Sequence, residues 1–259
     1  MTTNETHLLK NDELKIEGYK SYSRNRQNAA KGGIATSIKT KHADYAFKIS
    51  EGKDVEYIVT RHGQFQPPIN VINYYGSQES RQKIEEINHN WECILKEIIE
   101  IENKREGQVL IKDANYHIGS SHVKENHPKT SVGGKHLIDL VSSGEYILVN
   151  SLDICKGGPF TRYDPSDPNN NAKKSLLDVI VVSKNLLKYI EKLDIDSKLE
   201  WTPYSQYKGH LKYHDHYALL LVFNQIPMRK QIKYPGKKFT IWNTKKMVGK
   251  FIGIKLKIT

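Results

Sequence analysis

Six short apolar runs, spread along 259 residues, limit the folds open to this chain. Strands with one exposed face alternate between apolar and polar residues, whereas strands buried on both faces are apolar almost throughout. Most of these runs do not alternate, so they predict central strands of a packed sheet. They are VEYIVT (55–60), INVINYY (69–75), QVLI (108–111), YILVN (146–150), LLDVIVV (176–182) and YALLLVF (217–223).

Helical patterns lie between these runs. From Ser80 onward, apolar residues recur at the 3.6-residue spacing of an amphipathic helix, with Ser80 as a candidate N-cap. KHLIDLVSSGE (135–145) predicts a second helix that stops at Gly144. SKNLLKYIEKL (183–193) predicts a third, with Ser183 as its N-cap. Helices interleaved with buried strands indicate a layered α/β or α+β domain.

One long segment has no such pattern. KGGPFTRYDPSDPNNNAKKS (156–175) is dense in Gly, Pro, Asn and Asp, which favour turns and loops. A surface loop of this length inside a compact domain is usually either functional or disordered. The segment is therefore a place to look for functional residues.

Charge is distributed unevenly along the chain. The formal charge of +11 arises from 40 Lys and Arg against 29 Asp and Glu. Ten of the basic residues, and none of the acidic ones, lie between Met228 and Thr259. We therefore divide the chain into a folded domain, residues 1–227, and a basic tail, residues 228–259. Such a tail either binds nucleic-acid phosphates in a salt-sensitive way or is a solvated segment that aids solubility.

Composition also excludes some classes of protein. Cys93 and Cys155 are too few for a disulfide framework and fit a reducing compartment. No run approaches the roughly eighteen apolar residues of a membrane span, and the first residues lack the layout of a signal peptide. The sequence predicts an intracellular protein, in the nucleus or cytoplasm, with no membrane partner.

Polar residues stand within or beside several runs, and one more lies in NETHL (4–8), where an apolar core would not select them. Each alone has an ordinary explanation, because Asp and Asn cap turns. Together they indicate a site, because gathered carboxylates repel one another unless they bind a cation or take up a proton. Oxygen ligands favour Mg²⁺ or Mn²⁺ over Zn²⁺. The residues are Glu5, Tyr75, Asp113, Asn115, Asp178, Asp215 and His216.

A zinc site is an alternative interpretation of the last of these segments. His210, His214 and His216 lie close together in the sequence, beside Asp215. Imidazole and carboxylate groups are common zinc ligands. The metal-dependent phosphoesterase interpretation already uses Asp215 and His216, so we keep the zinc site only as the alternative.

In this order along the chain, the motifs resemble those of the endonuclease/exonuclease/phosphatase superfamily. Within it they resemble the endonuclease domain of LINE-type (non-LTR) retrotransposons, which is related to apurinic-site DNA repair endonucleases. KKFTIWNTKKMVGKFI (237–252) is similar to the connector between such an endonuclease and a reverse transcriptase. The resemblance covers residues 4–223 through NETHL (4–8), KGGIATSIK (31–39), NYYGSQES (73–80), KDAN (112–115), SLLDVIVVS (175–183) and HDHYALLL (214–221).

The resemblance implies a fold, an activity and a role for each residue. The fold is an α/β (α+β) four-layer sandwich of two packed mixed β-sheets flanked by helices. The activity is that of a divalent-metal-dependent phosphodiesterase, the DNA-nicking endonuclease domain of a retroelement. Its cofactor is Mg²⁺ or Mn²⁺, and its partners are DNA and a reverse transcriptase domain of the parent element. By this resemblance, Glu5 and Asp215 bind the metal, and Asp113 activates the water. Asn115 binds water or phosphate, and Tyr75 binds phosphate. His216, held by Asp178, stabilises the charge of the transition state.

The chain also departs from the family pattern. The family's first strand, with its Asn and the helix that follows, is missing before Glu5, so one sheet is expected to lack a strand. Lys112 replaces a Gly before Asp113, and His214 replaces a Ser before Asp215. These departures leave two other functions open. One is a catalytically impaired relic that only binds nucleic acid, and the other is a phosphoesterase with a phospholipid or phosphoinositide substrate.

Overall fold

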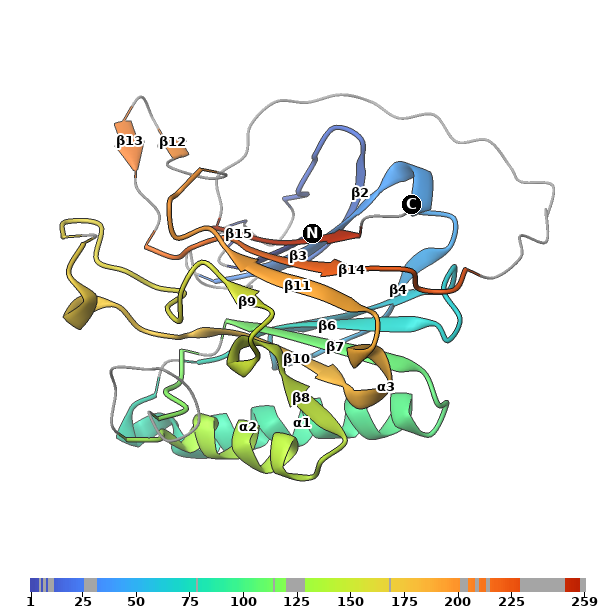
Figure 1. Ribbon diagram of the computed structural model, residues 1–259, viewed down its shortest axis with the longest axis horizontal. Coiled ribbons are helices and arrows are strands. Elements are labelled where there is room, and N and C mark those ends of the chain that lie inside the picture. Colours follow the sequence, from blue (N-terminus) through green and yellow to red (C-terminus); the bar gives the residue numbers. More distant parts are fainter. Residues whose placement is uncertain are drawn as a thin grey trace.

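The apolar runs form two β-sheets that pack face to face in the computed structural model of the chain (Figure 1). Three α-helices occur in the described residues, and all of them contact strands of one of these sheets. No helix in this part of the chain is both long and apolar enough to cross a bilayer. The structure describes residues 1–4, 6, 8, 12–25, 32–77, 79–113, 115–119, 129–167, 169–200, 205–207, 210–212, 215–228 and 250–256.

The sheet that carries the helices has six strands. Among its described strands, β6 and β7 form the only parallel pair, and the helix α1 makes the crossover between them that parallel neighbours require. In spatial order the strands are β4 (Ala46–Glu51), β5 (Tyr57–His62), β6 (Ile69–Tyr75), β7 (Gly107–Asp113), β10 (Asp178–Ser183) and β8 (Tyr146–Leu148).

The central strands of this sheet are buried on both faces. Along β10, Val179 and Val181 belong to the apolar core shared with the helices. Ile180 and Val182 belong to the core between the two sheets. Because successive side chains of a strand point to opposite faces, such a strand needs apolar residues at every position. This confirms the interpretation of the non-alternating runs.

The helices α1 (Ile84–Glu102) and α2 (Val132–Ser142) cover the outer face of the six-stranded sheet (Figure 1). Trp91 of α1 is fully buried, and its ring stacks on His136 of α2 at 5.7 Å. The predicted stop at Gly144 is confirmed by its left-handed backbone, with φ of 80°. The predicted N-cap Ser80 is wrong, because the short 3₁₀ helix η2 (Arg81–Lys83) lies between Ser80 and α1 and no side-chain bond caps it.

The third predicted helix is largely wrong. Only α3 (Lys184–Leu187) is helical, and β11 (Ile190–Ile195) follows it. Ser183 precedes α3 as predicted, but its side chain makes no capping bond. Leu193 and Ile195 are buried on the strand face that packs into the core between the sheets. Pairing of β11 with β14 therefore outweighs the helical pattern of this segment.

The second sheet has seven strands. Separately, β12 (Ser205–Tyr207) and β13 (His210–Lys212) pair antiparallel as a two-stranded sheet. Asn73 of β6 links the two large sheets, because its Nδ2 donates to the carbonyl oxygen of Ala35 at 3.1 Å. In spatial order the strands are β2 (Tyr19–Arg24), β3 (Ile34–Lys39), β1 (Thr2–Asn4), β15 (Lys250–Leu256), β14 (Leu219–Phe223), β11 and β9 (Cys155–Lys156).

The sequence led us to expect that one sheet lacks a strand, whereas the seven-stranded sheet contains β15 in its middle. This strand runs between β1 and β14, antiparallel to β1 with Ile252 opposite Thr2. It is parallel to β14, with Ile254 opposite Leu221. Residues 250–256, which the sequence placed in the basic tail, therefore pair with strands on both sides in the middle of the sheet. The boundary of the domain at residue 228 stays a prediction.

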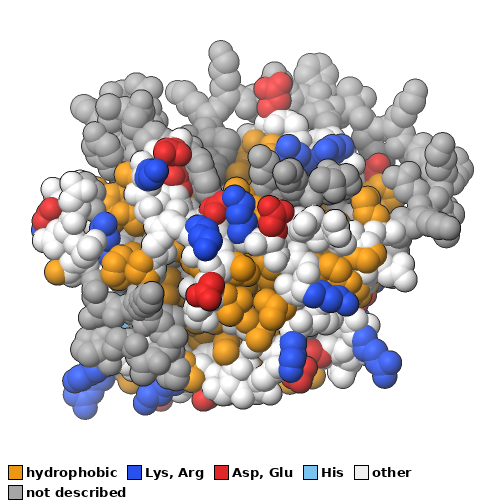
Figure 2. All heavy atoms as spheres, viewed as in Figure 1, with side chains coloured by type: hydrophobic (Ala, Val, Ile, Leu, Met, Phe, Trp, Pro, Cys, Tyr) orange, Lys and Arg blue, Asp and Glu red, His pale blue; other side chains and the backbone are white. Residues whose placement is uncertain are grey.

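Short 3₁₀ turns connect the larger elements, and charges of both signs lie on the surface. The turns are η1 (Thr40–His42), η3 (Val149–Ser151) and η4 (Asn171–Lys173). Figure 2 shows one face of the molecule, on which the described Lys and Arg side chains lie among Asp and Glu side chains. This agrees with the near balance of charge over residues 1–227.

His62 at the end of β5 predicts an acid-sensitive stability. Burial, followed by the positive charges of the Met1 amino group and His42, lowers the pKa of His62 from 6.5 to about 4. The folded state therefore holds this ring neutral, while the unfolded chain protonates it below its pKa of 6.5. Stability should fall as the pH drops from 6.5 towards 4, by up to about 3 kcal/mol.

Urea unfolding of the parent protein and of His62→Gln, measured at pH 7 and at pH 4.5, checks this expectation. The parent protein should lose more stability between the two pH values than the variant does. Equal losses in both proteins would show that His62 is not the group responsible.

Candidate active site

Three of the predicted site residues form one row across the six-stranded sheet. In the register of the strands, Asp113 of β7 lies opposite Tyr75 of β6 on one side. It lies opposite Asp178 of β10 on the other side. All three are therefore at the same end of the sheet, on the left in Figure 1. Strand pairing alone brings together residues that are far apart in the sequence.

A buried His–Asp pair lies at this end of the molecule. Nδ1 of His216 is 2.7 Å from Oδ2 of Asp178, and the two residues are 7% and 1% exposed. Asp178 belongs to the six-stranded sheet, whereas His216 precedes β14 of the other sheet. The pair therefore spans the two sheets. Burial at a close contact means that the carboxylate can both orient the imidazole and stabilise its charged form.

The backbone around Asp178 is held by two residues that the sequence analysis missed. Oγ1 of the buried Thr161 accepts hydrogen bonds from the backbone N–H groups of Leu177, at 2.9 Å, and Asp178, at 2.8 Å. Nδ2 of Asn150 donates to the carbonyl oxygen of Asp178 at 3.3 Å. Thr161 lies in the predicted loop 156–175, and its place in that polar segment was the one available signal.

The segment around Thr161 also holds the residues next to His216. The N–H of Tyr163 donates to the carbonyl oxygen of Asp215 at 2.9 Å, and the N–H of Tyr217 donates to that of Thr161 at 2.8 Å. The rings of Tyr163 and Tyr217 stack at 4.6 Å. Burial, the largest cause, raises the pKa of Tyr163 to about 12. Tyr163 is therefore a neutral phenol near pH 7 that supports the site by packing.

Asn115 joins the loop after β7 to the end of β6. Its Nδ2 donates to the carbonyl oxygen of Gly76 at 2.9 Å. Its backbone has a φ of 47°, a left-handed conformation that Asn adopts more readily than most residues. The loop packs closely on α2, because a Cβ on Gly134 would lie 2.1 Å from the carbonyl oxygen of His117. Asn115 is thus fixed beside the residue that follows Tyr75.

Of the two predicted metal ligands, the structure describes Asp215. Glu5 lies outside the described residues. The carboxylate of Asp215 is part-exposed, and its Oδ2 is 3.4 Å from Nε of Arg162. In the described part of the chain, no group of three or more His, Cys, Asp or Glu side chains is arranged so that it could hold a metal ion. The Asp215 carboxylate supplies oxygen donors of the kind that Mg²⁺ favours, and metal binding by Glu5 and Asp215 stays a prediction.

The structure describes some of the residues that depart from the family pattern and some of those in the alternative zinc site. The backbone of Lys112 pairs with Tyr74 of β6 and Val179 of β10, so the substitution does not interrupt the strand. His214 lies outside the described residues. The backbone of His210 belongs to the β12–β13 hairpin, whereas the ring of His216 contacts Asp178. The zinc site stays an untested alternative.

Two stacked sheets with these connections give the chain the fold of the endonuclease/exonuclease/phosphatase superfamily. This confirms the predicted α/β class with two packed sheets. The three α-helices of the described residues all contact the six-stranded sheet, so the predicted helical layer over the other sheet is not seen in that part of the chain. No protein-family model matches the sequence, and no curated protein matches it. Solved structures share the fold at low sequence identity.

Three of these structures illustrate the likeness. The endonuclease domain of TRAS1, a telomere-specific non-LTR retrotransposon, has a TM-score of 0.55 and 17% identity, and the match covers 83% of each chain. The catalytic domain of Xenopus laevis APE2 has a TM-score of 0.60 and 15% identity, over 85% of this chain and 79% of that one. The 3′ phosphatase NExo from Neisseria, solved with a product DNA hairpin, has a TM-score of 0.60 and 16% identity, over 83% and 85%.

Proposed function

We propose that the protein is a divalent-metal-dependent phosphodiesterase that nicks DNA, the endonuclease domain of a retroelement. The observation that carries the proposal is the buried contact of His216 with Asp178, at the end of the sheet where Asp113 and Tyr75 share a row with Asp178. A paired imidazole, a carboxylate and a phenol can together stabilise a phosphate and activate water.

Each residue has a role in the proposed reaction. An Nδ1–H of His216 donated to Asp178 leaves Nε2 as the ring nitrogen that meets the substrate. The imidazole stabilises the charge that develops on the phosphate oxygens as water attacks. Asp113 orients or deprotonates that water, while Asn115 and Tyr75 hold the water and the phosphate. A Mg²⁺ or Mn²⁺ ion held by Glu5 and Asp215 would supply further neutralisation of phosphate charge.

Two features support DNA as the substrate. One solved structure with this fold is a retrotransposon endonuclease, and another contains a product DNA hairpin. The second feature is the excess of basic residues from Met228 to Thr259, which can neutralise phosphates along a nucleic-acid backbone. A reverse transcriptase domain in the parent element is the proposed partner, on the basis of the connector-like segment 237–252.

The proposal is tested by incubating purified protein with supercoiled plasmid over a titration of Mg²⁺ and of Mn²⁺. Conversion to open circle, blocked by EDTA, is the expected result. Absence of nicking over the whole of both titrations would contradict the proposal.

A second candidate function is binding of nucleic acid without cleavage. It is favoured by the contact of Asp215 with Arg162, which places a permanent cation beside a predicted metal ligand. This function predicts binding that weakens steeply with salt and persists after Glu5→Ala. It also predicts that replacing Lys237, Lys238, Lys245 and Lys246 with Ala, which leaves the residues of β15 unchanged, weakens binding. Unchanged affinity in this variant would contradict it.

A further inference from the structure

We propose that Arg162 is a substrate-binding residue that grips a phosphate of the DNA beside the His216–Asp178 pair. The inference rests on the proposed phosphodiesterase function and adds to it a residue that the sequence analysis did not select. The Arg162 side chain is 43% exposed, and its Nε is 3.4 Å from Oδ2 of Asp215. It is therefore a cation at the surface, next to the residue that precedes His216.

The backbone fixes the position of Arg162. Its N–H donates to the carbonyl oxygen of Ser175 at 2.9 Å, and its own carbonyl oxygen accepts from the N–H of Ser175 at 3.0 Å. On the other side it forms an antiparallel bridge with His216. Arg162 is thus held between the segment that leads into β10 and the segment that leads into β14. These two segments carry Asp178 and His216.

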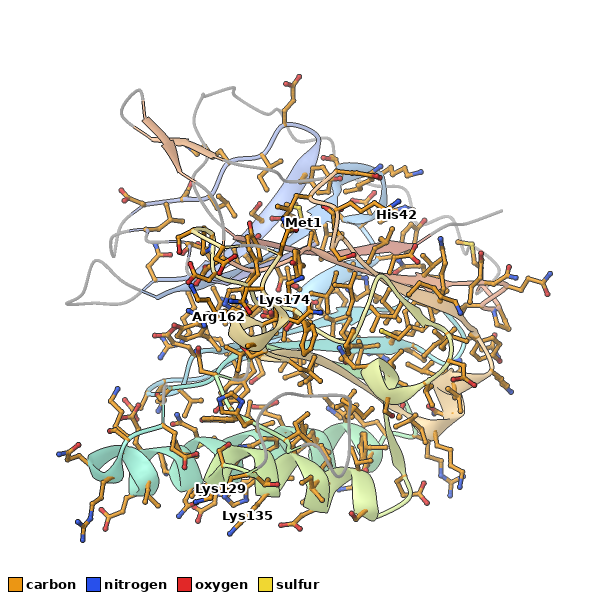
Figure 3. The ribbon with its side chains drawn as sticks, turned by 60° about the vertical axis from the view of Figure 1, so that its left-hand side comes forward. Met1, His42, Lys129, Lys135, Arg162 and Lys174 are labelled. Atoms are coloured by element: carbon orange, nitrogen blue, oxygen red, sulfur yellow. The ribbon has the colours of Figure 1, made fainter. Side chains whose placement is uncertain are left out.

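The direction of the side chain follows from its neighbours. Thr161 is fully buried and Tyr163 is 1% exposed. In an extended segment the residue between two inward-facing side chains points to the opposite side. Arg162 therefore faces outward while its backbone belongs to the site. Figure 3, which turns this end of the molecule forward, shows Arg162 here, with Lys174 labelled nearby.

The chemistry of the guanidinium favours a phosphate as its ligand. A guanidinium has five N–H donors in a planar fork that matches two phosphate oxygens. The contact with Asp215 uses Nε, and no other described residue binds the group. The two Nη groups therefore remain to donate to an anion. Because Asp215 steadies the fork, little conformational freedom is lost when a phosphate binds.

The phosphate that binds Arg162 belongs to the same DNA substrate that contacts His216. Arg162 bridges directly to the backbone of His216, so a phosphate on its Nη groups lies next to the proposed site of cleavage. Lys192 of β11 offers a matched comparison. Its side chain is 42% exposed and contacts a single carboxylate, that of Asp194, at 2.6 Å. It lies within a strand, away from the segments that hold the His–Asp pair.

The test compares Arg162→Met, Arg162→Lys and Lys192→Met with the parent protein. Affinity is measured by fluorescence anisotropy with a labelled DNA duplex over a range of salt, and KM and kcat by plasmid nicking. Arg162→Met should raise Kd and KM by about 10- to 100-fold and reduce the salt slope by about one. Arg162→Lys should recover part of the affinity, because it restores charge but not the fork. Lys192→Met should behave as the parent, and thermal melting should confirm that all variants fold.

The outcomes separate this inference from the function on which it rests. If the parent protein nicks DNA and Arg162→Met keeps its Kd, KM and salt slope, the inference is overturned and the function stands. An equal loss of DNA affinity in Lys192→Met would also overturn the inference, because removal of any surface cation would then have the same effect. If the parent neither binds nor nicks DNA, the proposed function fails and the inference fails with it.

Discussion

Asp178→Asn is expected to slow plasmid nicking by roughly 10²- to 10⁴-fold, the usual contribution of a positioned acid or base. The carboxylate of Asp178 is buried, and its Oδ2 contacts Nδ1 of His216 at 2.7 Å. An amide at this position keeps the volume but removes the negative charge that stabilises a protonated imidazole. The loss should appear mainly in kcat, because the interaction is strongest when charge develops on the phosphate.

Glu106→Gln provides the matched control for this prediction. Glu106 is also a buried carboxylate with a cationic partner, Arg61, but it precedes the first residue of β7, at the opposite end of that strand from Asp113. This variant should lose stability and keep its nicking rate per folded molecule. Equal effects of the two substitutions on kcat would show that Asp178 acts only through the fold.

Ile252→Pro is expected to lower the free energy of unfolding by about 2–4 kcal/mol. Ile252 lies in β15, opposite Thr2 of β1, and β14 flanks the same strand on its other side. Proline has no backbone N–H and is confined in sheets to edges and bulges. A proline in the middle of a seven-stranded sheet should therefore separate β1 from β14.

The stability of Ile252→Pro is measured by urea unfolding, with Ile252→Val as control. The valine variant keeps the N–H and a β-branched side chain, so it should lose no more than about 1.5 kcal/mol. An unfolding curve for Ile252→Pro that matches the parent would contradict the placement of residues 250–256 in the sheet. Size-exclusion chromatography of the same variant would detect association through the exposed edges of β1 and β14.

The strands buried on both faces could be predicted from the sequence. INVINYY was expected as a strand at 69–75, and β6 has these bounds. The run QVLI ended at Ile111, whereas β7 continues to Asp113. The extension arises from pairing, because β6 and β10 both continue beside Lys112 and Asp113. Local apolar content thus identifies a strand, but its neighbours decide where it ends.

Long-range pairing explains what could not be predicted. The helical pattern predicted over residues 183–193 includes the start of β11, yet residues 190–195 form a strand because β14 and β9 pair with them. Residues 250–256 follow a basic segment, and only the position between β1 and β14 makes them a central strand. In both cases the strands that pair with the segment are remote from it in the sequence. No local signal specifies such a choice.

For the candidate site too, the sequence predicted some residues, whereas only the structure gives their contacts. Polar residues at strand ends, and their order, indicated Asp113, Asn115 and Asp178 without a structure. The contact between Asp178 and His216 is what the structure adds, with its distance and burial. Thr161 and Arg162 had no signal beyond their place in a loop rich in Gly, Pro and Asn. Their importance depends on backbone bridges to segments far along the chain.

Single-turnover nicking of supercoiled plasmid in Mg²⁺ or Mn²⁺, by the parent protein and by His216→Ala, tests whether the His216–Asp178 pair takes part in cleavage. The parent should convert the plasmid to open circle, and His216→Ala, folded to the same extent by circular dichroism, should do so at least about 100-fold more slowly. Nicking by His216→Ala at the parent rate would contradict this role of the pair.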